Sequence, residues 1–121
     1  MERKEEELAV KFWRSLNEIV LSSRIVIDRP KGSRHPKYPM LVFPLDYGYL
    51  EGTKSTDGAE IDVWRGSENS NTVSSVVCTV DNVKRDSEIK ILIGCTIEET
   101  QTILDCYNSS DHMSALLINR Q

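Results

Sequence analysis

The sequence predicts a small protein of the α+β class, built mainly from β-strands, with one helix at the N-terminus and one late in the chain. Its 121 residues suit a single domain, which we expect to span residues 1–121. Short β-branched runs bounded by turn residues recur along the chain, and an apolar pattern with helical spacing occurs twice. Short strands separated by turns suggest a closed or nearly closed small barrel.

The first element is an amphipathic helix over residues 4–21, within an N-terminal segment of residues 1–22. Acidic residues fall in its first turns, where negative charge favours the helix dipole. We expect Phe12 and Trp13 to pack rather than to bind a ligand. This helix would pack on the barrel or meet another subunit. The apolar residues predicted to share one face are Leu8, Phe12, Leu16, Ile19 and Val20.

The strands are separated by polar turns and by one long loop. Residues 30–44 contain four prolines, which interrupt ladder pairing, so this segment is predicted to be a stiffened functional loop with one short strand near residues 40–43. The other predicted strands are 24–28, 47–50, 60–64, 72–80, 88–93 and 114–119.

The second helix is predicted to begin at a capping box. Thr96 and Glu99 are spaced so that each side chain can accept a hydrogen bond from the other residue's free backbone amide. The helix would continue to about Tyr107, with Ile103, Leu104 and Tyr107 on one face.

Composition narrows the class of protein. The net charge of −4 argues against non-specific nucleic-acid binding, which requires a basic face. No apolar run approaches the length of a membrane span, and the charged N-terminus has no signal-peptide core behind it. The three cysteines are widely spaced without a Cys-x-x-Cys pair, which favours reduced thiols and a cytoplasmic location.

An acidic turn carries the first functional signal. Asp57 and Asp62 flank a turn containing Gly58, so a following strand can bring both carboxylates to one side. Oxygen ligands without nearby His or Cys favour Mg²⁺, or Mn²⁺, over zinc. Acidic residues in such turns are more often merely solvated, so this signal alone is weak.

Cationic and tyrosine side chains strengthen this signal for a metal and phosphate site. Mg²⁺ is usually held by a few carboxylates together with substrate phosphates, and a phosphate needs cations on its other side. Tyr47 and Tyr107 can donate hydrogen bonds to phosphate oxygens. Together these groups indicate a site for phosphoanhydride hydrolysis. The candidate cations are Arg29, Lys31, Arg34, Lys37 and Lys90.

Three segments in order, residues 27–30, 43–49 and 57–63, resemble the soluble family I inorganic pyrophosphatases, particularly their short bacterial branch. The resemblance implies a five-stranded OB-like barrel with helices packed outside. It also implies Mg²⁺-dependent hydrolysis of pyrophosphate to two phosphates by a metal-activated water. We expect a homo-oligomer that binds this small substrate and neither nucleic acid nor membrane.

The resemblance also assigns residues. It makes Tyr47, Asp57 and Asp62 catalytic, with Tyr47 near the attacking water. Metal ligands would be Asp57, Asp62, Glu88 and Asp86. Substrate-binding residues would be Asp28, Arg29, Arg34, Lys37, Lys90 and Tyr107.

Departures from the family pattern leave alternatives open. Ala59 stands where the signature has an Asp, Phe43 replaces a tyrosine and Asn108 replaces a lysine. Loss of a general base costs about 10²–10⁴-fold in rate, so hydrolysis can survive at a reduced level. One alternative is a degenerate module that binds metal and a phosphate ligand with little turnover. Another is an OB-type nucleic-acid or protein interaction module, which the acidic balance disfavours.

Overall fold

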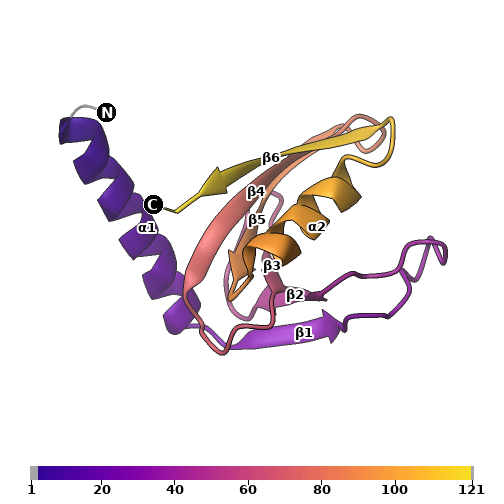
Figure 1. Ribbon diagram of the computed structural model, residues 1–121, viewed down its shortest axis with the longest axis horizontal. Helices are drawn as coiled ribbons and strands as arrows, with labels where there is room; N and C mark the ends of the chain where they lie inside the picture. The colour runs from indigo at the N-terminus through magenta and orange to yellow at the C-terminus, as the bar shows by residue number, and fades with distance from the viewer. Residues whose placement is uncertain (1–2, 121) are drawn as a thin grey trace.

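The computed structural model describes residues 3–120 and contains one curved, mixed sheet with two helices (Figure 1). The helices are α1 (Arg3–Leu21) and α2 (Ile97–Tyr107). The strands are β1 (Ile25–Arg29), β2 (Asp46–Leu50), β3 (Ile61–Arg65), β4 (Val73–Asp81), β5 (Asp86–Ile93) and β6 (Met113–Asn119). Each predicted element except the short strand near residues 40–43 is present, with boundaries shifted by at most two residues. No helix within residues 3–120 is both long and apolar enough to cross a membrane.

The strand order is β1-β2-β3-β5-β4-β6. Neighbouring strands are antiparallel except for β3 and β5, which run parallel. The predicted α+β, mainly β, OB-like fold is confirmed. The sheet has six strands where the family resemblance implies five, because β6 adds to β4. In the described part of the chain β1 and β6 do not pair, so the sheet is open at its edges.

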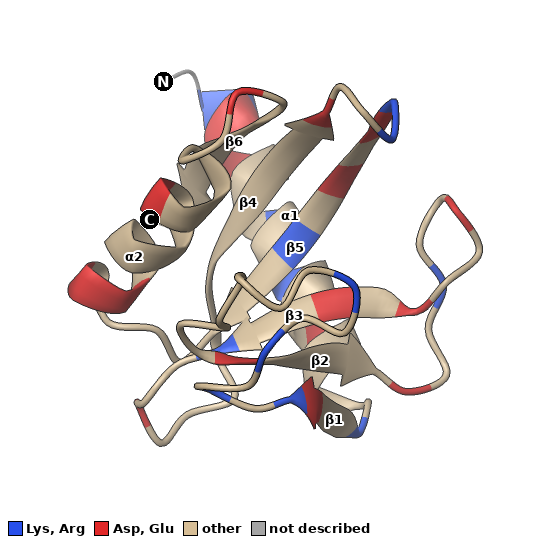
Figure 2. Cartoon of the chain, turned by 90° about the vertical axis from the view of Figure 1, so that its right-hand side faces the viewer, with Lys and Arg blue, Asp and Glu red and all other residues tan. Residues whose placement is uncertain are grey.

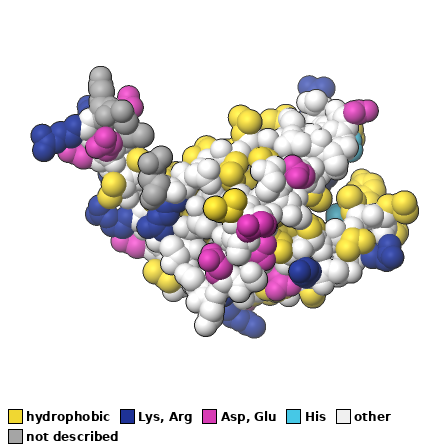
Figure 3. Space-filling view, viewed as in Figure 1, with side chains coloured by type: hydrophobic (Ala, Val, Ile, Leu, Met, Phe, Trp, Pro, Cys, Tyr) yellow, Lys and Arg dark blue, Asp and Glu magenta, His cyan; other side chains and the backbone are white. Residues whose placement is uncertain are grey.

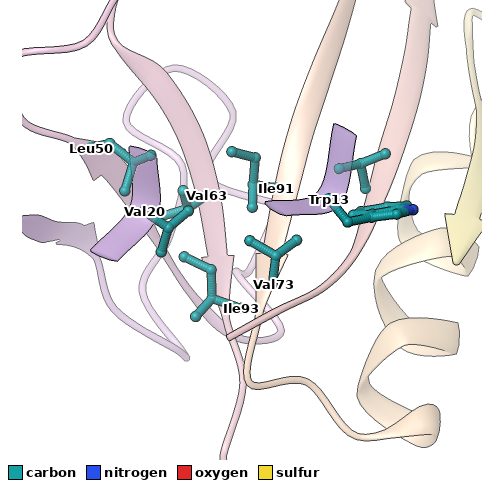
Figure 4. Close-up of a cluster of buried hydrophobic side chains, with 8 residues drawn as sticks. Trp13, Val20, Leu50, Val63, Val73, Ile91 and Ile93 are labelled. Atoms are coloured by element: carbon teal, nitrogen blue, oxygen red, sulfur yellow. The ribbon is translucent and has the colours of Figure 1, made fainter. Parts of the chain in front are cut away.

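The two faces of the sheet carry two separate hydrophobic clusters. Side chains alternate between faces along a strand, so Ile91 and Ile93 join Trp13 and Val20 of α1 in one cluster (Figure 4). Leu92, between them, joins the cluster that contains Ile103 of α2. The helices therefore cover opposite faces, and the functional residues of β3 and β5 must be assigned to one face or the other.

The α1 helix packs on the sheet through a different stripe from the predicted one. Trp13 and Val20 are buried, and Ala9 and Leu16 pack against the same cluster. The periodicity predicted that Leu8, Phe12 and Ile19 would pack together with Leu16 and Val20. In the structure the first three are exposed. Both stripes have helical spacing and differ by one residue. The stripe that contains Trp13 packs on the sheet, because its indole ring buries a large apolar area.

The capping box of α2 is confirmed. The hydroxyl of Thr96 accepts from the backbone amide of Glu99 at 3.1 Å, and Oε1 of Glu99 accepts from the amide of Thr96 at 2.9 Å. Glu99 also accepts from the backbone amide of Ser67 at 3.1 Å. This carboxylate therefore joins the start of α2 to the turn that follows β3.

The loop of residues 30–44 folds back on itself without forming the predicted strand. Its only pairing is an isolated bridge between Arg34 and Val42. The Gly32 amide donates to the Phe43 carbonyl at 2.8 Å, and the Phe43 amide donates to Ser33 at 2.9 Å. Figure 1 shows this loop reaching beyond the end of the sheet. It thereby supplies a wall that the sheet alone lacks.

Candidate active-site cleft

A cavity of about 820 Å³ opens on the side of the sheet that carries α2. Loop 30–44 forms one wall, and the turns after β4 and after α2 form the other. Figure 3 shows the surface hollowed between the loop and the rest of the molecule, with hydrophobic side chains on the loop. The predicted site residues that line the cavity are Asp28, Arg29, Tyr47, Asp62, Asp86, Glu88, Lys90 and Tyr107.

Lys90 lies at the centre of the polar part of this cavity. Its side chain is only 8% exposed, and Nζ lies 2.6 Å from Oδ2 of Asp62 and 2.5 Å from Oε2 of Glu88. Nζ also donates to the hydroxyl of Tyr47 at 3.0 Å. Figure 2 shows acidic and basic segments following one another along β5, close to β3. The cluster of Tyr47, Asp62, Glu88 and Lys90 is called the Lys90 cluster below.

The strand register explains why these residues meet. Val63 of β3 pairs with Ile91 of the parallel strand β5, so the preceding residues, Asp62 and Lys90, share the opposite face. Glu88 lies two residues before Lys90 and therefore projects to the same side. Asp62 and Lys90 are separated by 28 residues in sequence but are direct neighbours in the sheet.

The protonation of Lys90 follows from its neighbours. Burial alone lowers the pKa of an ammonium, but the charge of Asp62 and its hydrogen bond to Nζ outweigh burial, and the pKa of Lys90 is raised. The ammonium is therefore charged at neutral pH. It neutralises part of the negative charge of Asp62 and Glu88 within the cleft.

Two tyrosines complete the polar end of the cleft. Burial is the main cause that raises the pKa of Tyr47, and burial raises the pKa of Tyr107 to about 12. Both hydroxyls are therefore protonated at neutral pH. The hydroxyl of Tyr107 accepts from Nε1 of Trp64 at 3.0 Å, which leaves its own proton free to be donated to a ligand.

Four residues predicted for this site do not line the cavity: Lys31, Arg34, Lys37 and Asp57. Asp57 organises the turn before β3 by accepting from the Ser55 hydroxyl at 2.5 Å and from the Ala59 amide at 2.9 Å. These bonds are the main causes that lower the pKa of Asp57. The guanidinium of Arg34 donates to the Pro39 carbonyl at 2.8 Å within its own loop.

The acidic residues do not form a preassembled metal cage. Among residues 3–120, no three His, Cys, Asp or Glu side chains are arranged to hold a metal ion. Asp62 and Glu88 both approach the Lys90 ammonium, which lies between the two carboxylates. The predicted set of Asp57, Asp62, Asp86 and Glu88 therefore does not fit a resident metal in this arrangement.

Several lining residues have no motif that could have revealed them. Asp81 and Lys84 come from the end of β4 and the turn that follows it, and His112 comes from the turn before β6. Antiparallel pairing of β4 with both β5 and β6 brings these two turns to one end of the sheet. Only the strand order shows that they border the same cavity as Tyr47.

The sheet order and the cleft together define a small OB-like α+β protein. Among solved structures, the chain is similar to an inorganic pyrophosphatase from Coxiella burnetii. The TM-score is 0.53 at 11% sequence identity, over 79% of this chain and 84% of that one. No family model matches the chain, and no curated protein matches it in sequence. The likeness therefore establishes a pyrophosphatase-like fold.

Proposed function

We propose that the cleft binds pyrophosphate as its Mg²⁺ or Mn²⁺ complex and hydrolyses it to two phosphates. The observation that carries this proposal is the Lys90 cluster, whose lysine side chain is buried in the cleft of a pyrophosphatase-like fold. Mg²⁺ is usually held by one or two carboxylates together with substrate phosphates, not by an all-protein cage. An ion that arrives with the substrate does not require a preassembled site.

The cluster has the groups that such a complex needs. Asp62 and Glu88 supply carboxylate oxygens to the substrate's cation, which would release Lys90 to donate to a phosphate oxygen. Tyr47 and Tyr107, both neutral, can donate further hydrogen bonds. Arg29 lines the same cavity and adds positive charge on the side of loop 30–44.

A second candidate is binding of a phosphate ligand with little turnover. Two observations favour it. Lys90 is paired with both carboxylates, so binding of the substrate's cation must first break two short ion pairs. The turn that carries Asp57 has Ala59 where the signature has a third carboxylate, so that group is not available to activate water.

Phosphate release from pyrophosphate, measured with Mg²⁺, with Mn²⁺ and with a chelator, tests the proposal. We expect release that depends on the divalent ion and exceeds the rate without protein. Calorimetric titration with the non-hydrolysable methylene analogue of pyrophosphate measures binding separately. Binding without release would support the second candidate, and absence of both would overturn both. A shift of a single-stranded DNA probe would instead favour the OB-type interaction module.

A further inference from the structure

The wall of the cleft formed by loop 30–44 is a row of aromatic rings. The ring centroids of Tyr38 and His35 are 5.0 Å apart. His35 and Phe43 are stacked, with an interplanar angle of 12° and centroids 6.1 Å apart. Phe43 continues the row to Tyr47, with centroids 5.4 Å apart. The row therefore leads from the tip of the loop to the Lys90 cluster, because Tyr47 belongs to both.

Much of this wall is open to solvent. Tyr38 is 55% exposed, Leu41 51% and Val42 47%, and all three line the cavity. Inorganic pyrophosphate consists of charged oxygens and phosphorus, so it would leave this apolar surface uncovered. The volume of about 820 Å³ is within the range of pockets that hold organic ligands, about 300–1,000 Å³.

The charges of the cleft also argue against an exclusively anionic ligand. Acidic side chains outnumber the permanently cationic ones along its lining, and burial, followed by Arg29, lowers the pKa of His35, which keeps this ring neutral at pH 7. A ligand with an apolar aromatic part beside its anionic part fits this distribution better. The acidic residues are Asp28, Asp62, Asp81, Asp86 and Glu88, and the cationic ones are Arg29, Lys84 and Lys90.

We propose that this cleft also binds a nucleoside 5′-diphosphate, and binds it more tightly than inorganic pyrophosphate. Its base would lie against the rings of Tyr38, His35 and Phe43, and its diphosphate, as the Mg²⁺ complex, would lie at the Lys90 cluster. The position of the diphosphate rests on the proposed function. The position of the base rests on the ring row alone. Stacking on an aromatic ring strengthens the binding of a base by about 5- to 100-fold, whichever base it is.

The test compares Mg²⁺-ADP with Mg²⁺-pyrophosphate by calorimetric titration of the full chain. We expect ADP to bind at least about 10-fold more tightly, which corresponds to about 1.4 kcal/mol. Tyr38→Ala should weaken ADP binding by about 5- to 100-fold and leave pyrophosphate binding unchanged. Tyr38→Phe, which keeps the ring, should restore ADP binding. Met40→Ala is the matched control, since Met40 is 92% exposed on the same loop and does not line the cavity.

Each outcome decides a separate point. If pyrophosphate binds and ADP binds no more tightly, this inference is overturned and the proposed function stands. If ADP binds more tightly but pyrophosphate releases no phosphate, the inference is supported and the proposed hydrolysis fails. If neither ligand binds, both are overturned. Equal losses in Tyr38→Ala and Met40→Ala would mean that the loop, not the ring, determines binding, and would also overturn the inference.

Discussion

The ammonium of Lys90 lies 2.6 Å from Oδ2 of Asp62, its neighbour on the parallel strand. The same nitrogen lies 2.5 Å from Glu88. Two carboxylates that approach one point repel unless a cation lies between them. In this fold a side chain of the protein supplies that cation, so the pair is stable without any added ion.

Replacing this internal cation should create an affinity for divalent metal. In Lys90→Met the two carboxylates lose their partner, and we expect the free energy of unfolding to fall by about 1–3 kcal/mol. This is below the usual cost for a fully buried pair, because Asp62 and Glu88 are 33% and 30% exposed. Mn²⁺ binding, followed by electron paramagnetic resonance, should become tighter than in the unsubstituted protein.

The exposed lysine at position 54 provides the control for that change. Lys54→Met removes one positive charge from the surface outside the cavity lining and should change neither stability nor Mn²⁺ binding measurably. Unchanged Mn²⁺ affinity in Lys90→Met would show that Lys90 does not compete with a metal for Asp62 and Glu88.

Asp62 should be essential for hydrolysis. Asp62→Asn keeps the size of the side chain but removes the charge that faces Lys90. We expect Mg²⁺-dependent phosphate release to fall by at least about 100-fold, the scale of losing a catalytic group. Asp105→Asn, on the exposed side of α2, should retain full activity. An active Asp62→Asn protein with native circular dichroism would remove this carboxylate from the mechanism.

Tyr107 should make stability depend on alkaline pH. Its pKa rises from about 10 in the unfolded chain to about 12 in the fold, so its contribution is complete below pH 10 and is lost as pH rises toward 12. Over that interval each such group lowers the free energy of unfolding by about 1.4 kcal/mol for every unit by which pH rises. Denaturant unfolding at pH 9, 10 and 11 should show a shallower slope for Tyr107→Phe. Identical slopes would mean that Tyr107 ionises normally.

The exposed stripe of α1 predicts association of two copies of the chain. Leu8, Phe12 and Ile19 lie on one helical face and are 58%, 50% and 40% exposed. Lys11 and Glu18 follow the edge of this face near its opposite ends. In an antiparallel pair of α1 helices, Leu8 of one copy would contact Ile19 of the other, and Lys11 would face Glu18. We propose this pairing as the homo-oligomeric contact.

Sedimentation equilibrium tests the pairing. Phe12→Glu should give a monomer, because a buried carboxylate without a partner is unfavourable. Lys11→Glu should weaken the dimer, and adding Glu18→Lys should restore it, since the charges then face each other in reverse. A monomeric unsubstituted protein, or failure of the double variant to restore association, would contradict the antiparallel pairing.

Local patterns were sufficient to predict most elements of the fold. Thr96 and Glu99 identified the start of α2, and β-branched runs identified the strands, because both signals act over a few residues. The packed face of α1 could not be predicted in the same way. Its two stripes have the same period, and only the sheet decides between Trp13 and Phe12.

The candidate site was predicted only in part for a similar reason. The sequence and the family resemblance named Asp62, Glu88 and Lys90, and in the structure both carboxylates contact Lys90. It could not show that Lys90 bridges both carboxylates, because that contact depends on the register between β3 and β5. It also could not exclude Arg34 from the cavity lining, since the hydrogen bond from its guanidinium to the Pro39 carbonyl depends on the fold of the loop.

The parallel pairing of β3 with β5 also determines when the Lys90 cluster can form during folding. Residues 66–85, including all of β4, lie between the two strands, so Asp62 and Lys90 meet only after this long segment has closed. Closing such a loop is entropically unfavourable, and non-local pairings of this kind slow folding. Ligand binding should therefore return with the slowest refolding phase. A chain interrupted within β4 should recover neither the cluster nor the affinity.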